Sequence, residues 1–343
     1  MKTIDNCSLK EHNTFGIAAT AQRLVEYASV DELQMFVGRR AANGDTSPLL
    51  HIGGGSNLLF LGDYNGTVLH SALKDITVTA DEGEYVYVRV SAGITWDDWV
   101  QYALDSHWYG LENLSGIPGE VGAAAVQNIG AYGAEAKDYI LFVDTVDLQT
   151  GAIRHFMAEE CRYGYRDSIF KQELRGRYAV THVHFCLTHD FHPRLEYGGI
   201  RRAIQARGIE EVNLTAEQLR QTILEIRREK LPDPATLGNA GSFFKNPIVD
   251  RATFERIAAT YPDAPHYEVD ADHVKVPAGW MIEQCGWKGK ALGRAGVYEK
   301  QALVLVNRGD ATGKDISDLC AAIQADVEAR FGIRIEPEVN FIS

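Results

Sequence analysis

One stretch decides how the fold of this chain is interpreted: His51-Ile52-Gly53-Gly54-Gly55-Ser56-Asn57-Leu58-Leu59-Phe60. Its three consecutive glycines follow the apolar pair Leu49-Leu50, so a short strand should lead into a tight loop. Backbone N–H groups of such a loop can converge on an anion, and Ser56 and Asn57 add side-chain hydrogen bonds. The loop lacks the Gly-Lys-Ser/Thr of a P-loop and the Gly-x-Gly-x-x-Gly of a dinucleotide fingerprint. The sequence therefore predicts a phosphate cradle of another kind, with a tight hairpin turn as the alternative.

A second run of small residues extends from Ser115 to Gly133 and reads SGIPGEVGAAAVQNIGAYG. Its side chains offer little material for a core of their own. Such a backbone can lie against a large flat ligand or offer its amides to a diphosphate. A flavin dinucleotide meets both requirements, while close packing of a helix against a sheet is the alternative.

A third run, Gly238 to Pro247, reads GNAGSFFKNP and places one hydroxyl, that of Ser242, among glycines and aromatic residues. The glycines let the backbone approach a ligand closely, the phenylalanines can exclude water, and Lys245 and Asn246 supply a charge and an amide. This setting is typical of a reacting serine. On the residues alone, a Gly-rich turn before an ordinary strand explains the run equally well.

Length and composition are those of a soluble globular protein. The 343 residues exceed one average core and predict two or three domains, and a hydrophobic content of 45% is enough to bury them. A net charge of -13 argues against a general nucleic-acid surface. The five cysteines lack CxxC spacing, the 11 histidines form no HExxH motif, and no signal peptide or membrane span is visible. We therefore expect a cytoplasmic protein without a metal site.

Periodicity indicates a mixture of helices and short strands, which is typical of an α+β chain. Thr95 looks like a helix cap, and Thr215 to Gln218 has the form of a capping box. We predict helices at 30–42, from Thr95, from Thr215 to the Leu231-Pro232 pair and at 315–330. We predict strands at 49–50, 86–90, 140–148, 179–187, 303–306 and 333–341.

Taken in order, the three runs resemble the UDP-N-acetylenolpyruvoylglucosamine reductase family, whose members are FAD enzymes that make UDP-N-acetylmuramate for peptidoglycan. The resemblance spans nearly the whole chain. It also rests on four shorter motifs, Tyr163 to Ser168, Lys230-Leu231-Pro232, Gln301-Ala302-Leu303 and Glu336 to Val339.

The resemblance implies an α+β chain that joins an FAD-binding fold of the vanillyl-alcohol-oxidase (PCMH) type, in two subdomains, to an α+β substrate-binding domain. We expect FAD-binding subdomain 1 at 1–66, completed by a C-terminal strand at 329–343. Subdomain 2, which includes a tyrosine loop, is expected at 67–214, and the substrate-binding domain at 215–328.

The resemblance also implies three catalytic residues: Ser242 as the proton donor, with Arg166 and Glu338 stabilising an enolate. A planar guanidinium holds a carboxylate in two hydrogen bonds and stays charged at any working pH, which suits Arg166 to that role. A surface ion pair is the alternative for Arg166. Glu336 should point the same way as Glu338, so the spacing leaves both open and only the family pattern favours Glu338.

For the cofactor, the resemblance implies non-covalent FAD, reduced by NADPH before the UDP-sugar enters the same cleft. The implied FAD contacts are Gly53, Gly54, Gly55, Ser56, Asn57, Ser115, Gly116, Pro118, Gly119, Gly122, Ala123, Gln127, Asn128, Gly130, Ala131 and Tyr132. The implied substrate contacts are Tyr197, Arg227, Lys230, Asn246 and Gln301. We expect a monomer whose partners are these small molecules, with no nucleic acid and no membrane.

Two departures from the family pattern are Asn340, where many relatives carry arginine, and His51, where an aliphatic residue is usual. Covalent flavin attachment at His51 is the alternative to a plain strand histidine, which we favour. Two other function classes stay open on the sequence: an oxidase that shares the cofactor fold, and a silent nucleotide-sugar binding protein. A colourless purified protein would indicate the second, and fast reoxidation by air the first.

Overall fold

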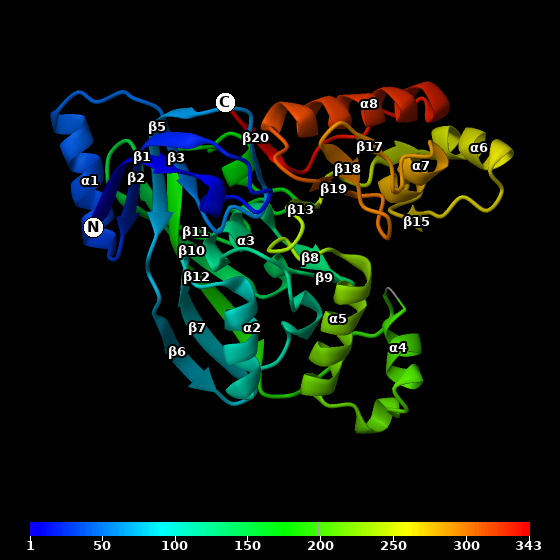
Figure 1. The fold of residues 1–343 in the computed structure, drawn as a ribbon. Helices are drawn as coiled ribbons and strands as arrows, with labels where there is room; N and C mark the ends of the chain where they lie inside the picture. Colours follow the sequence, from blue (N-terminus) through cyan, green and yellow to red (C-terminus); the bar gives the residue numbers. More distant parts are fainter. Residues whose placement is uncertain (198) are drawn as a thin grey trace. The chain divides into compact units, whose positions relative to one another are not determined.

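The computed structural model describes residues 1–197 and 199–343, which form two compact units. The first unit comprises Met1–Cys7, Ala21–Gly55 and Asn65–Arg228. The second comprises Ser8–Thr20, Ser56–Tyr64 and Glu229–Ser343. Both mix helices with short strands (Figure 1), which confirms the predicted α+β class. No helix in this described part of the chain is long and apolar enough to cross a bilayer.

The glycine loop of the first unit emerges from a four-stranded sheet with the order β1-β2-β5-β3. Its strands are β1 (Lys2–Ser8), β2 (Thr20–Tyr27), β3 (Leu49–Ile52) and β5 (Tyr64–Ser71). Strand β3 pairs in parallel with β5, so the chain must cross over between them, and the 53–57 loop lies at the start of that crossover. Helix α1 (Val30–Ala42) is confirmed, and Ser29 caps it by accepting a hydrogen bond from the Glu32 amide at 3.1 Å.

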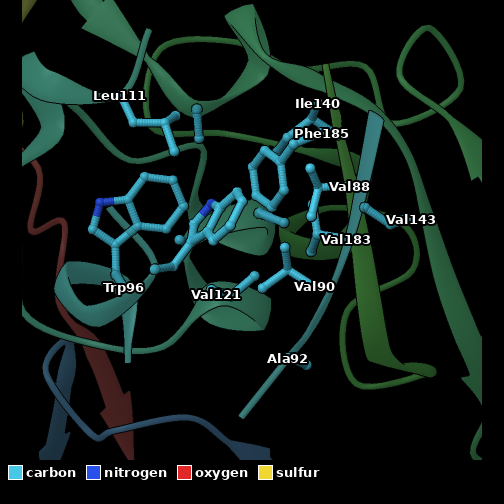
Figure 2. Packing of buried hydrophobic residues seen from close by; sticks show 14 of the residues in the cluster. Val88, Val90, Ala92, Trp96, Leu111, Val121, Ile140, Val143, Val183 and Phe185 are labelled. Carbon is cyan, nitrogen blue, oxygen red and sulfur yellow. The ribbon is translucent and has the colours of Figure 1, made fainter. Parts of the chain in front are cut away.

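A second, five-stranded antiparallel sheet carries the main core of the first unit. Its order is β11 (Ile153–Met157), β10 (Ile140–Asp147), β12 (Tyr178–Thr188), β7 (Tyr85–Ser91) and β6 (Ile76–Glu82). The alternation predicted for β7 buries Val88 and Val90 against α2 (Trp96–Asp105) and α3 (Val121–Gln127). Figure 2 shows Trp96 and Phe185 in this core, with ring centroids 6.1 Å apart.

The predicted helix start at Thr95 is confirmed, but its capping role is wrong, because the Thr95 side chain makes no capping hydrogen bond. The backbone supplies the anchor instead. Thr95 pairs with Glu120, and the Trp96 amide donates to the Gly119 carbonyl oxygen at 2.9 Å. The start of α2 is thereby joined to the small-residue run.

Short elements follow in the rest of the first unit. They are η2 (Glu112–Leu114), β8 (Gly130–Ala131), β9 (Ala134–Glu135), η3 (Ala136–Asp138), η4 (Ile169–Lys171), α4 (Ile200–Ala206) and η5 (Glu211–Asn213). Helix α5 (Ala216–Lys230) begins at the predicted capping box, where Thr215 and Gln218 exchange side-chain to backbone hydrogen bonds of 3.0 and 3.2 Å.

The second unit is built on the sheet β13-β19-β18-β17 and the smaller sheet β14-β16-β15. These strands are β13 (Asn239–Ser242), β14 (Ile248–Asp250), β15 (Tyr267–Glu268), β16 (His273–Lys275), β17 (Ala291–Leu292), β18 (Ala295–Val297) and β19 (Val304–Asn307). The helices are α6 (Arg251–Thr260), α7 (Ala278–Gln284) and α8 (Gly313–Phe331). Strand β20 (Asn340–Ile342) pairs in parallel with β4 (Leu58–Phe60).

The strand predicted at 333–341 is wrong over most of its length, since only β20 is a regular strand. Pro337 has no N–H to donate, which prevents a continuous ladder. Residues 336–338 form an irregular bridge instead: the Lys245 amide donates to Glu336 and the Glu338 amide donates to Phe243. This bridge sets the position of the predicted catalytic glutamate.

Candidate active site

Two glycine-containing segments of the first unit lie close together. A Cβ atom on Gly53 would come within 3.0 Å of the Ala123 Cβ, and one on Gly54 within 3.5 Å of the Gly119 Cα. The first distance is tighter than most Cβ contacts, so a side chain at 53 would force Ala123 to shift, and glycine favours this approach. Residues of the predicted phosphate cradle and of the small-residue run are therefore brought together. Glycine-rich backbones held this close can offer their N–H groups together to the diphosphate of a dinucleotide, which fits the predicted FAD site.

The segment that follows α3 is held in an unusual conformation. Asn128 and Tyr132 have φ angles of 47° and 49°, in the left-handed region that only a few non-glycine residues adopt. The Asn128 side-chain amide donates to the Gly164 carbonyl oxygen at 2.8 Å and to a Glu135 carboxylate oxygen at 3.0 Å. Residues in this region cluster where surrounding contacts impose the geometry, often at functional sites.

Arg166 lies on the turn that Asn128 holds. Its φ is 55°, and its guanidinium donates to the carbonyl oxygen of Gly130. The Ser168 hydroxyl donates to the Val126 carbonyl oxygen at 2.6 Å, and the Lys171 ammonium bridges Gln127 and the Arg166 carbonyl at 2.7 and 2.8 Å. The predicted catalytic arginine and several predicted FAD contacts thus form one hydrogen-bonded cluster in the first unit.

Ser242 is the exposed last residue of β13 in the second unit. Its pairing with Val304 follows a bulge, and Gly241 has a φ of 67° there. Bulges of this kind re-aim a side chain. Phe243 and Phe244 are buried in the core of their own unit, with ring centroids 5.2 Å apart. They anchor the strand and leave the Ser242 side chain exposed, whereas the sequence suggested that they exclude water.

Glu338 lies beside this strand, because its amide donates to the Phe243 carbonyl oxygen at 2.8 Å. The amide of the Asn57 side chain donates to the Glu338 carbonyl oxygen at 3.2 Å. Glu336 is exposed, whereas Glu338 is half-buried. The Asn340 backbone N–H donates to the Asn57 carbonyl oxygen at 3.0 Å, and its side-chain amide donates to the same oxygen at 3.3 Å, so this departure from the family pattern adds a hydrogen bond at the end of the glycine loop. The second unit thus brings Ser242, Glu338 and Asn57 together, while Arg166 belongs to the first.

The predicted substrate residues occupy different settings. Arg227 donates from Nε to the Gly116 carbonyl oxygen at 3.1 Å, and burial lowers the pKa of its guanidinium. Tyr197 is exposed, and Lys230 is exposed at the end of α5. The Asn246 side-chain oxygen accepts from the first amide of α7 at 2.9 Å, and Gln301 Oε1 accepts from the Leu303 amide at 3.3 Å.

His51 is held within its strand by Tyr27. The Tyr27 hydroxyl lies 2.8 Å from His51 Nε2, the rings stack, and burial lowers the pKa of His51 to about 4. These contacts support a structural histidine. Among the described residues, Glu84, Asp190 and His192 have potential ligand atoms within 4.8 Å of one another. All three are exposed, and nothing else in their surroundings supports a metal site.

Comparisons with known proteins agree with this geometry. Residues 21–157 match a family described as FAD binding domain, and residues 233–342 match the C-terminal domain of UDP-N-acetylenolpyruvoylglucosamine reductase. A protein of the latter name from Bacteroides fragilis is 55% identical over 98% of both chains. The chain belongs to the UDP-N-acetylenolpyruvoylglucosamine reductase family.

Other members of this reductase family are also similar over most of their length. The proteins from Azoarcus sp. and Pseudomonas putida are 48% and 46% identical and are covered over 95% and 98% of their chains. A crystal structure of the Thermus caldophilus reductase matches the whole chain in fold, with a TM-score of 0.66 at 24% identity. The chain is thus an FAD-dependent oxidoreductase, and its predicted fold class is confirmed.

The sequence did not indicate two residues that organise the site of this family member. Asn113 is 2% exposed and donates to the carbonyl oxygens of Tyr132 and Arg194 at 2.8 and 2.9 Å. It thereby ties the backbone at Arg194, three residues before Tyr197, to the 130–133 turn. Glu120, behind Gly53, accepts a hydrogen bond of 2.9 Å from His70. A single asparagine or glutamate gives no pattern from which either role could be predicted.

The His70–Glu120 pair predicts a pH dependence of stability. Glu120 and then Glu26 raise the pKa of His70 against the effect of burial. The pKa of His70 is higher in the folded protein than in the unfolded chain. Protonated His70 therefore stabilises the fold fully below about pH 6.5, and this stabilisation is lost as the pH rises through the folded-state pKa. Burial lowers the pKa values of His51 and His182 to about 4, so these two residues reduce the stability of the fold as the pH falls into the acid range.

We therefore expect the free energy of unfolding to fall between about pH 6 and pH 9 more steeply in the native protein than in a His70→Gln variant. Urea unfolding of the two proteins at matched pH values measures the difference. Equal slopes would show that His70 carries no extra proton in the folded state.

Proposed function

We propose that this chain reduces the enolpyruvyl ether of UDP-N-acetylglucosamine to UDP-N-acetylmuramate, with NADPH as electron donor, and so supplies a peptidoglycan precursor. The observation that carries the proposal is the placement of Ser242 and Glu338 on adjoining segments, with Asn57 of the glycine loop bonded to Glu338. The identity of 55% to a reductase named for this substrate, over 98% of both chains, supports it.

The chemistry sets three tasks for the protein. When bound and already reduced by NADPH, FAD would supply hydride to the terminal methylene carbon of the enolpyruvyl group, which becomes a methyl group, and would return to its oxidised form. The negative charge that results spreads from the adjacent carbon into the carboxylate, and a guanidinium such as that of Arg166 stabilises it through two hydrogen bonds. A proton must then reach the adjacent carbon, and Ser242 is the donor that we assign. Glu338 would help to polarise the forming enolate.

The remaining assignments belong to the same proposal. FAD would bind without a covalent link along the 53–57 loop and the 115–132 segment, whose glycines let the two backbones approach each other closely. The substrate would be held by Arg227, Lys230, Asn246 and Gln301, with Tyr197 closing over its diphosphate. NADPH and the UDP-sugar would use one cleft in turn, and we propose a cytoplasmic monomer.

An anaerobic spectral titration tests the reaction. Purified protein should be yellow, should bleach with NADPH, and should regain its colour on addition of the enolpyruvyl substrate faster than on admission of air. Recovery by air alone, with no response to the substrate, would indicate an oxidase and contradict the proposal. If the protein does not bleach with NADPH but bleaches with another reductant, the proposed reduction of the substrate stands and NADPH is excluded as its electron donor.

A further inference from the structure

The backbone of Gly116 is held from both sides. The Gly116 amide donates to Asp97 Oδ1 at 2.6 Å, and its carbonyl oxygen accepts from Arg227 Nε at 3.1 Å. Gly116 has a φ of 69°, and a Cβ there would come within 2.8 Å of Leu224 Cδ2. Helix α2 provides Asp97, and α5 provides Arg227 and Leu224. Two helices thus fix one residue of the 115–119 loop.

Asp97 is itself fixed by a buried arginine. Arg220 is 5% exposed and holds both Asp97 carboxylate oxygens, at 2.7 and 3.0 Å. Its Nε donates to Gln101 Oε1 at 2.7 Å, so a second residue of α2 orients the guanidinium. A buried ion pair contributes little net stability, because desolvation offsets the attraction, but it can specify one geometry. Here that geometry determines where the Gly116 amide lies.

The charges of this group also suit an anionic ligand. Asp97 accepts hydrogen bonds from both Arg220 and Gly116, so its carboxylate faces these two donors of the protein. Arg220 and Arg227 bring one more positive charge than Asp97 removes. A loop that is fixed in advance loses less conformational entropy when a ligand binds, which strengthens binding without any new contact.

We propose that Asp97 and Arg220 are positioning residues for the cofactor, which set the affinity for a flavin dinucleotide by fixing the 115–119 loop before the cofactor binds. The inference rests on the proposed contact of that loop with FAD. Neither residue needs to touch the cofactor, because both act through the Gly116 peptide.

The test compares Asp97→Asn with a matched control, Asp147→Asn. Asp147 is 4% exposed, accepts from the Gln149 amide at 2.8 Å and pairs with Arg177 at 3.1 Å, but it lies on β10 away from the loop. Titration of apoprotein with FAD, followed by flavin fluorescence, should show a dissociation constant raised at least about tenfold for Asp97→Asn. The Asp147→Asn value should stay within about twofold of the native value, although both variants lose stability.

A double variant, Asp97→Ala/Arg220→Met, removes both charges together and guards against misfolding of the single variant. It should fold and should bind FAD as weakly as Asp97→Asn. Native-like FAD affinity in either loop variant would overturn the proposal. Equal weakening in Asp147→Asn would do the same, since a general loss of stability would then explain the effect.

Hydrogen exchange separates this failure from a failure of the proposed FAD contact. In the native protein, FAD should slow exchange in peptides that cover 115–119. Absence of that protection would remove the loop from the cofactor site and the positioning role with it. Protection of the loop together with unchanged affinity in Asp97→Asn would reject the positioning role alone.

Discussion

Replacing Ser242 by alanine should leave reduction of the bound flavin by NADPH unchanged and slow its reoxidation by the enolpyruvyl substrate by about 10²- to 10⁴-fold, the range that general acid catalysis contributes. The reason is that only the second half-reaction delivers a proton to carbon. Ser242 is exposed at the end of a bulged strand, whereas its neighbours Phe243 and Phe244 are buried. Loss of one exposed hydroxyl should therefore not disturb the fold. Stopped-flow absorbance of the flavin measures both halves.

The conservative variant Ser242→Cys provides the control for chemistry, because a thiol is also a proton donor of similar size. We expect it to recover part of the rate that alanine loses, with a changed pH profile. If alanine slows both half-reactions equally, the residue has a structural role and the assignment as proton donor is wrong. Unchanged reoxidation in alanine would remove Ser242 from the chemistry altogether.

Local signals predicted the parts of this fold that depend on local contacts. The Thr215–Gln218 capping box and the α1 helix are where the sequence placed them, because the stabilising contacts lie within one turn of each helix. The glycine positions also predicted the 53–55 loop, where a Cβ on Gly53 would press against Ala123.

Contacts between distant segments account for what the sequence could not predict. Arg220 and Asp97 are 123 residues apart, and each occupies an amphipathic helix where a charge is ordinary. The Pro337 bridge could not be predicted, because its partner, Phe244, lies 93 residues earlier in the chain. Thr95 fits a capping pattern, yet backbone pairing with Glu120 anchors the helix start. Such contacts depend on the chain topology, which the sequence indicated only through its resemblance to a family.

Replacing Arg166 by lysine should slow the substrate half-reaction by about 10²-fold or more, the usual effect of removing one donor from an anion-stabilising site. Lysine keeps the charge, but one ammonium cannot reproduce the two parallel hydrogen bonds of a guanidinium to a carboxylate. It would also lose the planar donor that Arg166 uses on the Gly130 carbonyl oxygen. NADPH-driven flavin reduction should change much less, because no enolate forms in that step.

The chain provides a closely matched control for this substitution in Arg162, four residues earlier. Arg162 also has a left-handed backbone, with a φ of 47° against 55° for Arg166, and it forms an exposed ion pair with Glu173 at 2.5 Å. Since exposed ion pairs contribute little, Arg162→Lys should retain native rates in both half-reactions and native stability. Any cost of placing lysine in this backbone conformation affects both variants. A large effect confined to Arg166→Lys and to the substrate half-reaction therefore reports enolate stabilisation. Equal effects in the two variants would show that Arg166 only maintains the conformation of its turn.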